Sequence, residues 1–269
     1  MFTPSVAVAL FFVPFALAQD NSLGVQAIEA HFTQSLLVPD LLSSFTPSSL
    51  LTVNFAGVGE LQPGQALVKE QSAPYPTVKV TPGNSSVTLN GTYTLAMVDA
   101  EAPGSKLPEG QTRHWLVNGV KISGNDISNS SAVAVTDYAG PGPAAGSGVH
   151  RYVVVLYEQP ANFSPPEALS KPGVPVQPFV FSDYVKNSNL GPLVAATYFT
   201  VQEGTATVSA VPTSSVISST LKPAGSSTSK GASGTGSASA PGSSSSNGAS
   251  TLTVPAAATL FGMLFALVM

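Results

Sequence analysis

The sequence of 269 residues has no cysteine, only three histidines and few charged residues. Without cysteine the chain forms no disulfide, and it offers no thiolate to a zinc ion or an iron–sulfur cluster. With so few metal-binding side chains, we also expect no metal and no other cofactor. The net charge of −4 leaves no basic surface for a phosphate backbone, so we expect no nucleic-acid partner.

Charged residues make up 9% of the chain, against about 25% in an ordinary soluble domain, so something other than charge must keep it soluble. All fourteen acidic residues and eight of the ten basic ones lie between Asp20 and Glu203. The two ends have a different composition from this middle part. We therefore expect one folded domain over residues 19–204, flanked by segments of other kinds.

The first 18 residues are uncharged and mostly apolar, and they end in the small-residue pattern Ala16-Leu17-Ala18. This pattern predicts a secretory signal peptide that is cut after Ala18. A membrane-spanning anchor is the alternative. It needs about 20 apolar residues, whereas this run is shorter and contains Pro14.

Residues 205–247 contain Ser, Thr, Gly, Ala and Pro, with two lysines and no acidic residue. Such a segment cannot bury enough apolar surface to offset its chain entropy, which predicts a disordered stalk that is either O-glycosylated or a plain linker.

Residues 248–269 are apolar to the end and are followed by no basic residue, which is the layout of a glycosylphosphatidylinositol attachment signal. We expect attachment at Asn247, with Ser246 and Gly248 as the nearest competitors. A tail-anchored helix is the alternative, but this stretch is short for a bilayer. The protein should then lie on the outer face of the plasma membrane or in the cell wall, held to the membrane by its lipid.

The middle of the chain is rich in short β-type runs. Val25, Ile28, Phe32 and Leu36 fall near helical spacing and predict one short helix first. After it, runs of Val, Leu, Tyr and Thr between Pro and Gly clusters predict strands at 50–55, 77–80, 92–98, 114–117, 132–135 and 152–157. Residues 95–98 and 153–156 are continuously apolar, so both faces of these strands should be covered. We predict a mainly β domain, an antiparallel β-sandwich with a few short helices.

Four Asn-X-Ser/Thr sequons predict glycosylation in exposed loops, and sugars would supply the solubility that charge does not. Their asparagines are Asn84, Asn90, Asn129 and Asn162.

Two segments concentrate polar residues at strand ends. Asp99 and Glu101 follow an apolar run, Pro103 fixes the turn after them, and His114 comes eleven residues later. In the second segment, the glycine-rich stretch 138–148 leads into a central strand that begins near a His-Arg pair. Glycines expose backbone N–H groups and the pair adds donors and charge, so this segment could bind an anion.

These segments resemble the signature motifs of the phosphatidylethanolamine-binding proteins. The motifs follow in the same order over about residues 25 to 202, and they include Asp99-Ala100-Glu101-Ala102-Pro103, Arg113-His114-Trp115, the loop from Tyr138 to Gly142, Gly148-Val149-His150-Arg151-Tyr152 and Leu190 to Phe199. The resemblance implies a large antiparallel β-sandwich with a small pocket for phosphate-type or acetate-type anions and phospholipid head groups. Family members act as kinase regulators, flowering signals and inhibitors of serine carboxypeptidases, and catalysis is not their established role. The secretory signal, stalk and lipid tail favour a secreted, lipid-anchored member of fungal type.

Carried over to this chain, the family's pocket would be lined by Asp99, Glu101, Pro103, His114, Gly142, His150 and Tyr152. Arg151 would brace a carboxylate or the loop. Imidazoles beside carboxylates tend to become more basic, so a partly protonated histidine pair could attract a phosphate. The chain departs from the family in having Glu101 where Asp is usual, Arg113 where many members have a second His, and no helix after residue 201.

Two alternatives to a ligand pocket remain. The cluster of Asp99, His114 and His150 could be a polar network that only orders the loops. Catalysis by Ser147 is the second alternative, but this serine lacks the strand–elbow–helix context of a nucleophile, so we expect no enzyme. We predict a binding module for a phosphate-type anion or phospholipid head group. The competing function is a protein-interaction module that inhibits a serine carboxypeptidase or a related hydrolase.

Overall fold

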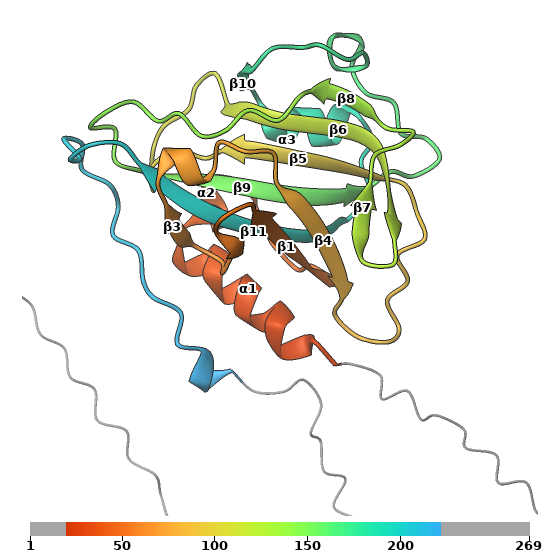
Figure 1. Cartoon of the computed structure of the whole chain (residues 1–269), viewed down its shortest axis with the longest axis horizontal. Helices are drawn as coiled ribbons and strands as arrows, with labels where there is room; N and C mark the ends of the chain where they lie inside the picture. The colour runs from red at the N-terminus through yellow and green to blue at the C-terminus, as the bar shows by residue number, and fades with distance from the viewer. Residues whose placement is uncertain (1–19, 222–269) are drawn as a thin grey trace, which may run out of the picture. The chain divides into compact units, whose positions relative to one another are not determined.

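The computed structural model describes residues 20–221 (Figure 1). The expected signal peptide, most of the expected stalk, the apolar tail and Asn247 lie outside these residues. No helix within residues 20–221 is long and apolar enough to cross a membrane.

Strands dominate the described part of the chain, as the sequence predicts. The helices are α1 (Ser22–Gln34), α2 (Leu37–Asp40) and α3 (Phe181–Asn187), with short 3-10 turns η1 (Lys69–Gln71), η2 (Glu167–Leu169) and η3 (Ser218–Thr220). The strands are β1 (Ser49–Phe55), β2 (Gly59–Glu60), β3 (Gln65–Leu67), β4 (Thr77–Pro82), β5 (Tyr93–Asp99), β6 (Gln111–Ser123), β7 (Asp126–Ser128), β8 (Val133–Thr136), β9 (Val149–Glu158), β10 (Gln177–Phe179) and β11 (Leu193–Gln202). All six predicted strands and the first helix are confirmed.

The strands form one curled path in the order β2-β1-β4-β7-β6-β5-β9-β11-β3, and β8 and β10 also pair with β6. The long strand β6 joins the two layers, since it pairs with β5 over most of its length and with β7 at its end. The predicted antiparallel β-sandwich with a few short helices is confirmed, and one short pairing in it, that of β3 with β11, is parallel. A three-residue strand leaves too little pattern for its direction to be read from sequence.

Two apolar cores cover the two faces of the central strands. One core lies between the layers and includes Phe55, Met97 and Phe199. The other lies under α1 and α3 and includes Phe32 and Phe181. Every residue of β5 is buried, and so are all but the two end residues of β9, which confirms that these continuously apolar strands are covered on both sides.

The chain after β11 continues to contact the domain. The backbone N–H of Thr207 donates to Gly146 O (2.9 Å), that of Val211 to Pro103 O (3.0 Å) and that of Ser214 to Gln34 O (3.1 Å). Within the expected stalk, Thr207 and Val211 therefore lie against the loops at Gly146 and Pro103, and Ser214 lies against the end of α1. The boundary at residue 204 stays a prediction.

All four sequon asparagines are exposed and lie outside strands and helices. This placement gives a glycosyltransferase free access to each of them, and their glycosylation stays a prediction.

Candidate functional site

Three neighbouring strands bring the predicted polar residues to one end of the sandwich. Asp99 ends β5 and lies directly opposite Tyr152 of β9 in the antiparallel register. Because opposite residues of such a pair point to the same face, both side chains lie on one side of the sheet. His150 lies two residues before Tyr152 on that same side, and His114 comes from β6, the other neighbour of β5.

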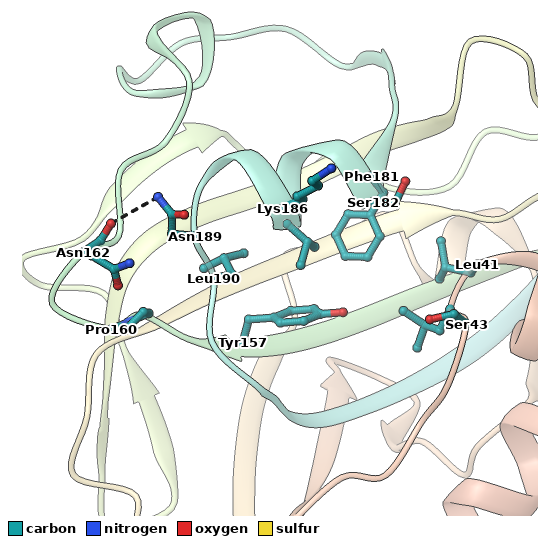
Figure 2. Close-up of a pocket in the computed structure, with 12 residues that line it drawn as sticks. Leu41, Ser43, Tyr157, Pro160, Asn162, Phe181, Ser182, Lys186, Asn189 and Leu190 are labelled. Carbon is teal, nitrogen blue, oxygen red and sulfur yellow. Dashed lines mark hydrogen bonds between the residues drawn. The ribbon is translucent and has the colours of Figure 1, made fainter.

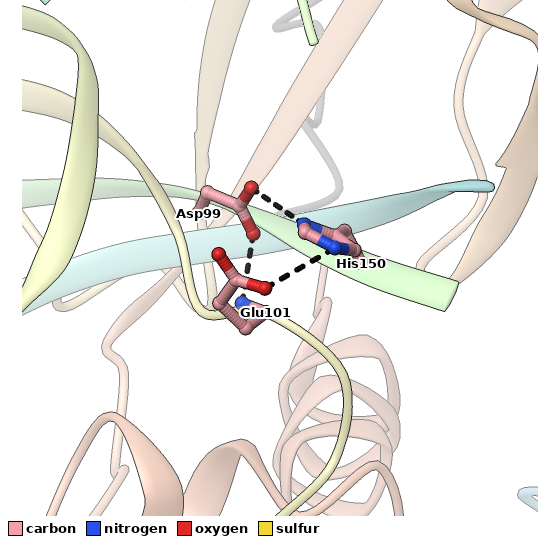
Figure 3. A group of neighbouring side chains, drawn as sticks. All are labelled: Asp99, Glu101 and His150. Carbon is pink, nitrogen blue, oxygen red and sulfur yellow. Dashed lines mark hydrogen bonds and ion pairs between the residues drawn. The ribbon is translucent and has the colours of Figure 1, made fainter. Parts of the chain in front are cut away.

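His150 is the centre of a hydrogen-bonded cluster (Figure 3). Its Nδ1 lies 2.8 Å from Asp99 Oδ2, and its Nε2 lies 3.2 Å from Glu101 Oε2. The Ser147 hydroxyl also lies 2.8 Å from Nε2. Burial alone would lower the pKa of His150, but the hydrogen bond with Asp99 and the charges of Asp99 and Glu101 outweigh it, so the pKa is raised.

His114 lies on the other side of Tyr152. The rings of His114 and Tyr152 meet edge to face with centroids 5.3 Å apart, while His150 stacks on the same tyrosine at 6.3 Å. His114 Nδ1 lies 3.1 Å from Ala139 O. Burial lowers the pKa of His114 despite the nearby Asp99 carboxylate, so the prediction that both imidazoles become more basic is wrong for this one.

Tyr152 contacts both imidazole rings and is completely buried. Its hydroxyl meets no partner at hydrogen-bond geometry, although the Asp99 carboxylate and the Gly142 backbone lie near it. Burial, and after it the Asp99 charge, raises the pKa of this phenol, so it stays a neutral donor. A buried donor without an acceptor costs about 1–3 kcal/mol. A ligand that offered an acceptor atom to this hydroxyl would recover that free energy on binding.

Glu101 follows β5 in a left-handed backbone conformation with φ 57°, which is uncommon outside glycine. Its N–H donates to Asp99 Oδ1 at 2.7 Å, and this bond turns the loop back over the strand end. The pKa of Glu101 is raised, first by burial and then by the Asp99 charge. The Glu101 side chain is 32% exposed, and its Oε2 lies beside His150 Nε2, the nitrogen that an external anion would use.

Arg151 holds this loop from below, as expected for a bracing residue. Its guanidinium donates to the carbonyl oxygens of Ala100, Glu101 and Ala102 and to that of Ser35, and it pairs with Asp40 at 3.0 Å. The loop's carbonyl groups therefore point inward at a buried cation. This arrangement leaves the Glu101 side chain on the outer side, facing His150.

Pro103 and Gly142 are the two remaining residues of the predicted site. Pro103 is partly exposed and accepts the Val211 N–H. Gly142 is exposed, and nothing lies within 4 Å of the position where a Cβ would be. The structure therefore brings Asp99, Glu101, His114, His150 and Tyr152 into one cluster, and Pro103 and Gly142 lie in the more exposed loops next to it.

The cluster also has to be tested as a metal site, since Asp99, Glu101 and His150 offer ligand atoms within 4.8 Å of one another. Each carboxylate takes a different nitrogen of the same ring. An ion on Nε2 would therefore have Glu101 beside it and Asp99 only behind the imidazole. With two carboxylates on opposite sides of one imidazole, the geometry fits proton exchange better than metal coordination.

The two histidines should titrate in a fixed order. We expect an NMR pKa above the ordinary 6.5 for His150 and below it for His114. The Asp99→Asn substitution should lower the pKa of His150, because it removes the charge and the acceptor that raise it. Since the pKa of His150 is raised by folding, its contribution to stability is full at low pH and is lost as pH rises through the folded pKa. Histidine Hε1 signals measure both values, and the reverse order would contradict this electrostatic account.

A separate pocket of about 580 Å³ lies on the other face of the sheet, against α3 (Figure 2). Its walls include Leu41, Tyr157, Phe181 and Lys186, and the exposed sequon residue Asn162 stands at its edge. None of the predicted site residues apart from this sequon lines it. Among the described residues that line it, Lys186 is the one charged residue, so the lining does not indicate a particular class of ligand or reaction.

Fold and cluster together define a curled β-sandwich with a histidine–carboxylate site at the ends of its central strands. The chain belongs to the phosphatidylethanolamine-binding protein family, whose model matches residues 43–199. The resemblance seen in the sequence is thereby confirmed at the level of the family.

Among its relatives, a 26 kDa secreted antigen of Toxocara canis is 36% identical over 136 residues, which are 50% of this chain and 48% of the antigen. The chain thus matches about half the length of this relative. Two solved structures share the fold. One is a carboxypeptidase Y inhibitor complexed with its cognate proteinase (TM-score 0.57, 22% identity, 66% of this chain and 96% of that one). The other is the phosphatidylethanolamine-binding protein of Plasmodium vivax (TM-score 0.50, 16% identity, 65% and 96%).

Proposed function

We propose that this protein is an extracellular binding module whose cluster around Tyr152 takes a phosphate-type anion, with phosphoethanolamine, a phospholipid head group, as the best-fitting form. The observation that carries the proposal is the buried Tyr152 hydroxyl, a neutral donor with no partner at full hydrogen-bond geometry, on a ring that contacts both histidines. A phosphate oxygen would supply the missing acceptor. The proposed role is binding and not turnover.

The charge of the cluster favours a zwitterion over a simple anion. With His150 protonated, the two carboxylates leave the trio of Asp99, Glu101 and His150 with one net negative charge. A bare phosphate would meet this charge, whereas the ammonium group of phosphoethanolamine would pair with Glu101. Because Glu101 is partly exposed, its side chain can turn outward and free His150 Nε2 for the phosphate.

The test is NMR titration of the histidine signals with phosphoethanolamine, with inorganic phosphate in parallel. We expect both His114 and His150 to shift, and the Tyr152→Phe substitution to weaken binding about 10- to 100-fold, since a hydrogen bond to a charged group contributes about 1.5–3 kcal/mol. Because the hydroxyl has no partner at full hydrogen-bond geometry in the free protein, this variant should be at least as stable as the wild type.

The matched control is Tyr157→Phe, because Tyr157 is a buried tyrosine of the same strand that lines the other pocket. Its binding should equal that of the wild type. If neither compound shifts the histidines, the head-group site is refuted. Equal affinity for inorganic phosphate would instead refute only the pairing of the ammonium group with Glu101.

A second candidate function is inhibition of a serine carboxypeptidase or related hydrolase. It is favoured by the shared fold with the carboxypeptidase Y inhibitor. Normal inhibition by Tyr152→Phe and His150→Gln variants, together with no head-group binding by the wild type, would favour this function. No inhibition by the wild type would exclude it for the enzyme tested.

We expect the protein to be located at the cell surface. The predicted signal peptide and the predicted lipid attachment at Asn247 would place it there, and the Toxocara canis relative is named a secreted antigen. Treatment of intact cells with phosphatidylinositol-specific phospholipase C should release the protein. Release by detergent alone would contradict the lipid anchor.

A further inference from the structure

Ser147 completes a hydrogen-bonded chain that head-group binding does not need. Its hydroxyl lies 2.8 Å from His150 Nε2, and His150 Nδ1 lies 2.8 Å from Asp99 Oδ2. Asp99 is buried and Ser147 is partly exposed. Carboxylate, imidazole and hydroxyl thus follow one another from the interior toward solvent, the order that activates a serine in acyl transfer.

We propose that Ser147 is a nucleophile, activated by His150 and oriented through Asp99, which accepts an acyl group from a carboxylic ester. Ser147 Oγ forms a bond to the carbonyl carbon of the ester and transfers its proton to His150 Nε2. The ester C–O bond then breaks, and the imidazolium returns the proton to the leaving alkoxide, which departs as an alcohol. The product is an acyl-serine, and no other reactant is required.

Two protonation states of His150 decide whether Ser147 is active. When the ring is an imidazolium, Nδ1–H donates to Asp99 and Nε2–H to Glu101, and the Ser147 hydroxyl donates to Ala144 O at 2.6 Å. When the ring is neutral, Nε2 carries a lone pair that accepts the Ser147 proton. Only the neutral ring can act as a general base.

Ser147 is partly exposed and lies between two buried glycines, both with positive φ. Thr207 lies beside Gly146 and Val208 beside Gly148. Within residues 20–221, the N–H of Gly148 has no backbone acceptor. The N–H of the residue after a nucleophile is a common donor to the oxyanion formed in acyl transfer. As expected from the sequence, Ser147 does not lie in a strand–elbow–helix motif. It lies in a turn before β9, and its hydroxyl reaches His150, three residues later.

The charges around His150 set the pH range of the reaction. Asp99 and Glu101 raise its pKa, and Arg151 acts in the opposite sense. His114 and Tyr152, which stacks on His150, are the other titratable groups nearby, and Tyr152 is neutral. Acylation should therefore rise with pH as His150 loses its proton. The Glu101→Gln substitution removes one stabilising charge and should move this rise to lower pH.

The experiment treats the full secreted chain with p-nitrophenyl acetate and follows acetylation by intact mass and peptide mapping. We expect one acetyl group on Ser147, formed at least about 100-fold faster than any labelling of Ser147→Ala, since a positioned general base contributes about 10²–10⁴-fold. Asp99→Asn should slow the reaction while Ser147 is still present. The matched control is Ser105→Ala, which removes an exposed loop serine and should label like the wild type.

Acetylation at another residue, or equal labelling of Ser147→Ala, would overturn the proposal. A pH profile that does not move in Glu101→Gln would also overturn it, because His150 would then not be the base. Circular dichroism and thermal unfolding of each variant show that it is folded. The proposal is separate from head-group binding, since titration with phosphoethanolamine can succeed or fail whatever the outcome of the labelling.

Discussion

Replacing Arg151 by methionine should lower the free energy of unfolding by about 3–5 kcal/mol, because it removes a buried cation that donates to four carbonyl groups and to a partly exposed carboxylate. The Arg151 side chain is 2% exposed and pairs with Asp40. It also donates to four backbone carbonyl groups, which include that of Ser35, 116 positions away in sequence. Without the guanidinium, the Ser35 and Ala100 carbonyl groups lose their donor. The Glu101 and Ala102 carbonyl groups and the Asp40 carboxylate each lose one of two donors. Urea unfolding followed through Trp115, the single and buried tryptophan, measures the loss.

Arg113 provides the matched control, because it is a buried arginine in an opposite situation. It donates to Thr136 Oγ1 (2.7 Å) and Pro175 O (3.0 Å), one terminal nitrogen has no partner, and its cation lies 5.0 Å from the Phe179 ring. Within residues 20–221 it forms no ion pair. An apolar side chain of similar volume often replaces such a charge without loss, so Arg113→Met should stay within about 1 kcal/mol of the wild type. Equal losses in the two variants would show that charge pairing does not explain the role of Arg151.

The Arg151 result bears on the site as well as on stability. The same guanidinium holds the backbone on both sides of Glu101, whose left-handed conformation aims its carboxylate at His150. Because the loop is fixed by these hydrogen bonds, the Glu101 carboxylate stays beside His150 Nε2, the nitrogen that a ligand would use. The site is therefore set by a competition between Glu101 and an incoming anion for His150.

The central strands could be predicted from sequence because their composition reflects burial on both faces. Residues 95–98 and 153–156 are apolar without alternation, and each packs between two cores. The direction of the three-residue strand β3 could not be read, since its pairing with β11 depends on residues about 130 positions away. Strand existence is a local property, whereas pairing is not.

The members of the site could be named from motifs, but their contacts could not. That Asp99 faces Tyr152 is fixed by the register of β5 against β9, which no spacing along the chain reveals. The activation of Ser147 depends on a turn that brings its hydroxyl to the ring three residues later. The lowered pKa of His114 follows from how deeply the fold buries it. Motifs therefore identified the residues, and tertiary structure decided their protonation and their partners.

The Gly110→Ala substitution should destabilise the domain by about 2–5 kcal/mol. Gly110 precedes β6 with φ +85°, where an alanine loses about 1–2 kcal/mol. Its Cβ would also collide with the carbonyl group of Phe179 and lie 2.6 Å from the Val180 nitrogen. These are backbone atoms of β10 and the turn after it, which cannot rotate away. They must shift, at a further cost of about 1–3 kcal/mol.

Gly173→Ala is the control that separates the two causes. Gly173 has almost the same φ, +89°, but nothing lies within 4 Å of its Cβ position. It should therefore lose only the backbone part, about 1–2 kcal/mol. Urea unfolding of both variants measures the difference, which reports the close approach of Gly110 to β10. This strand pairs with Gln111, Thr112 and Arg113 of β6, and Arg113 directly precedes His114. Equal losses would mean that β10 shifts at no cost in free energy. The packing of β10 against β6 could then not be what fixes the position of His114.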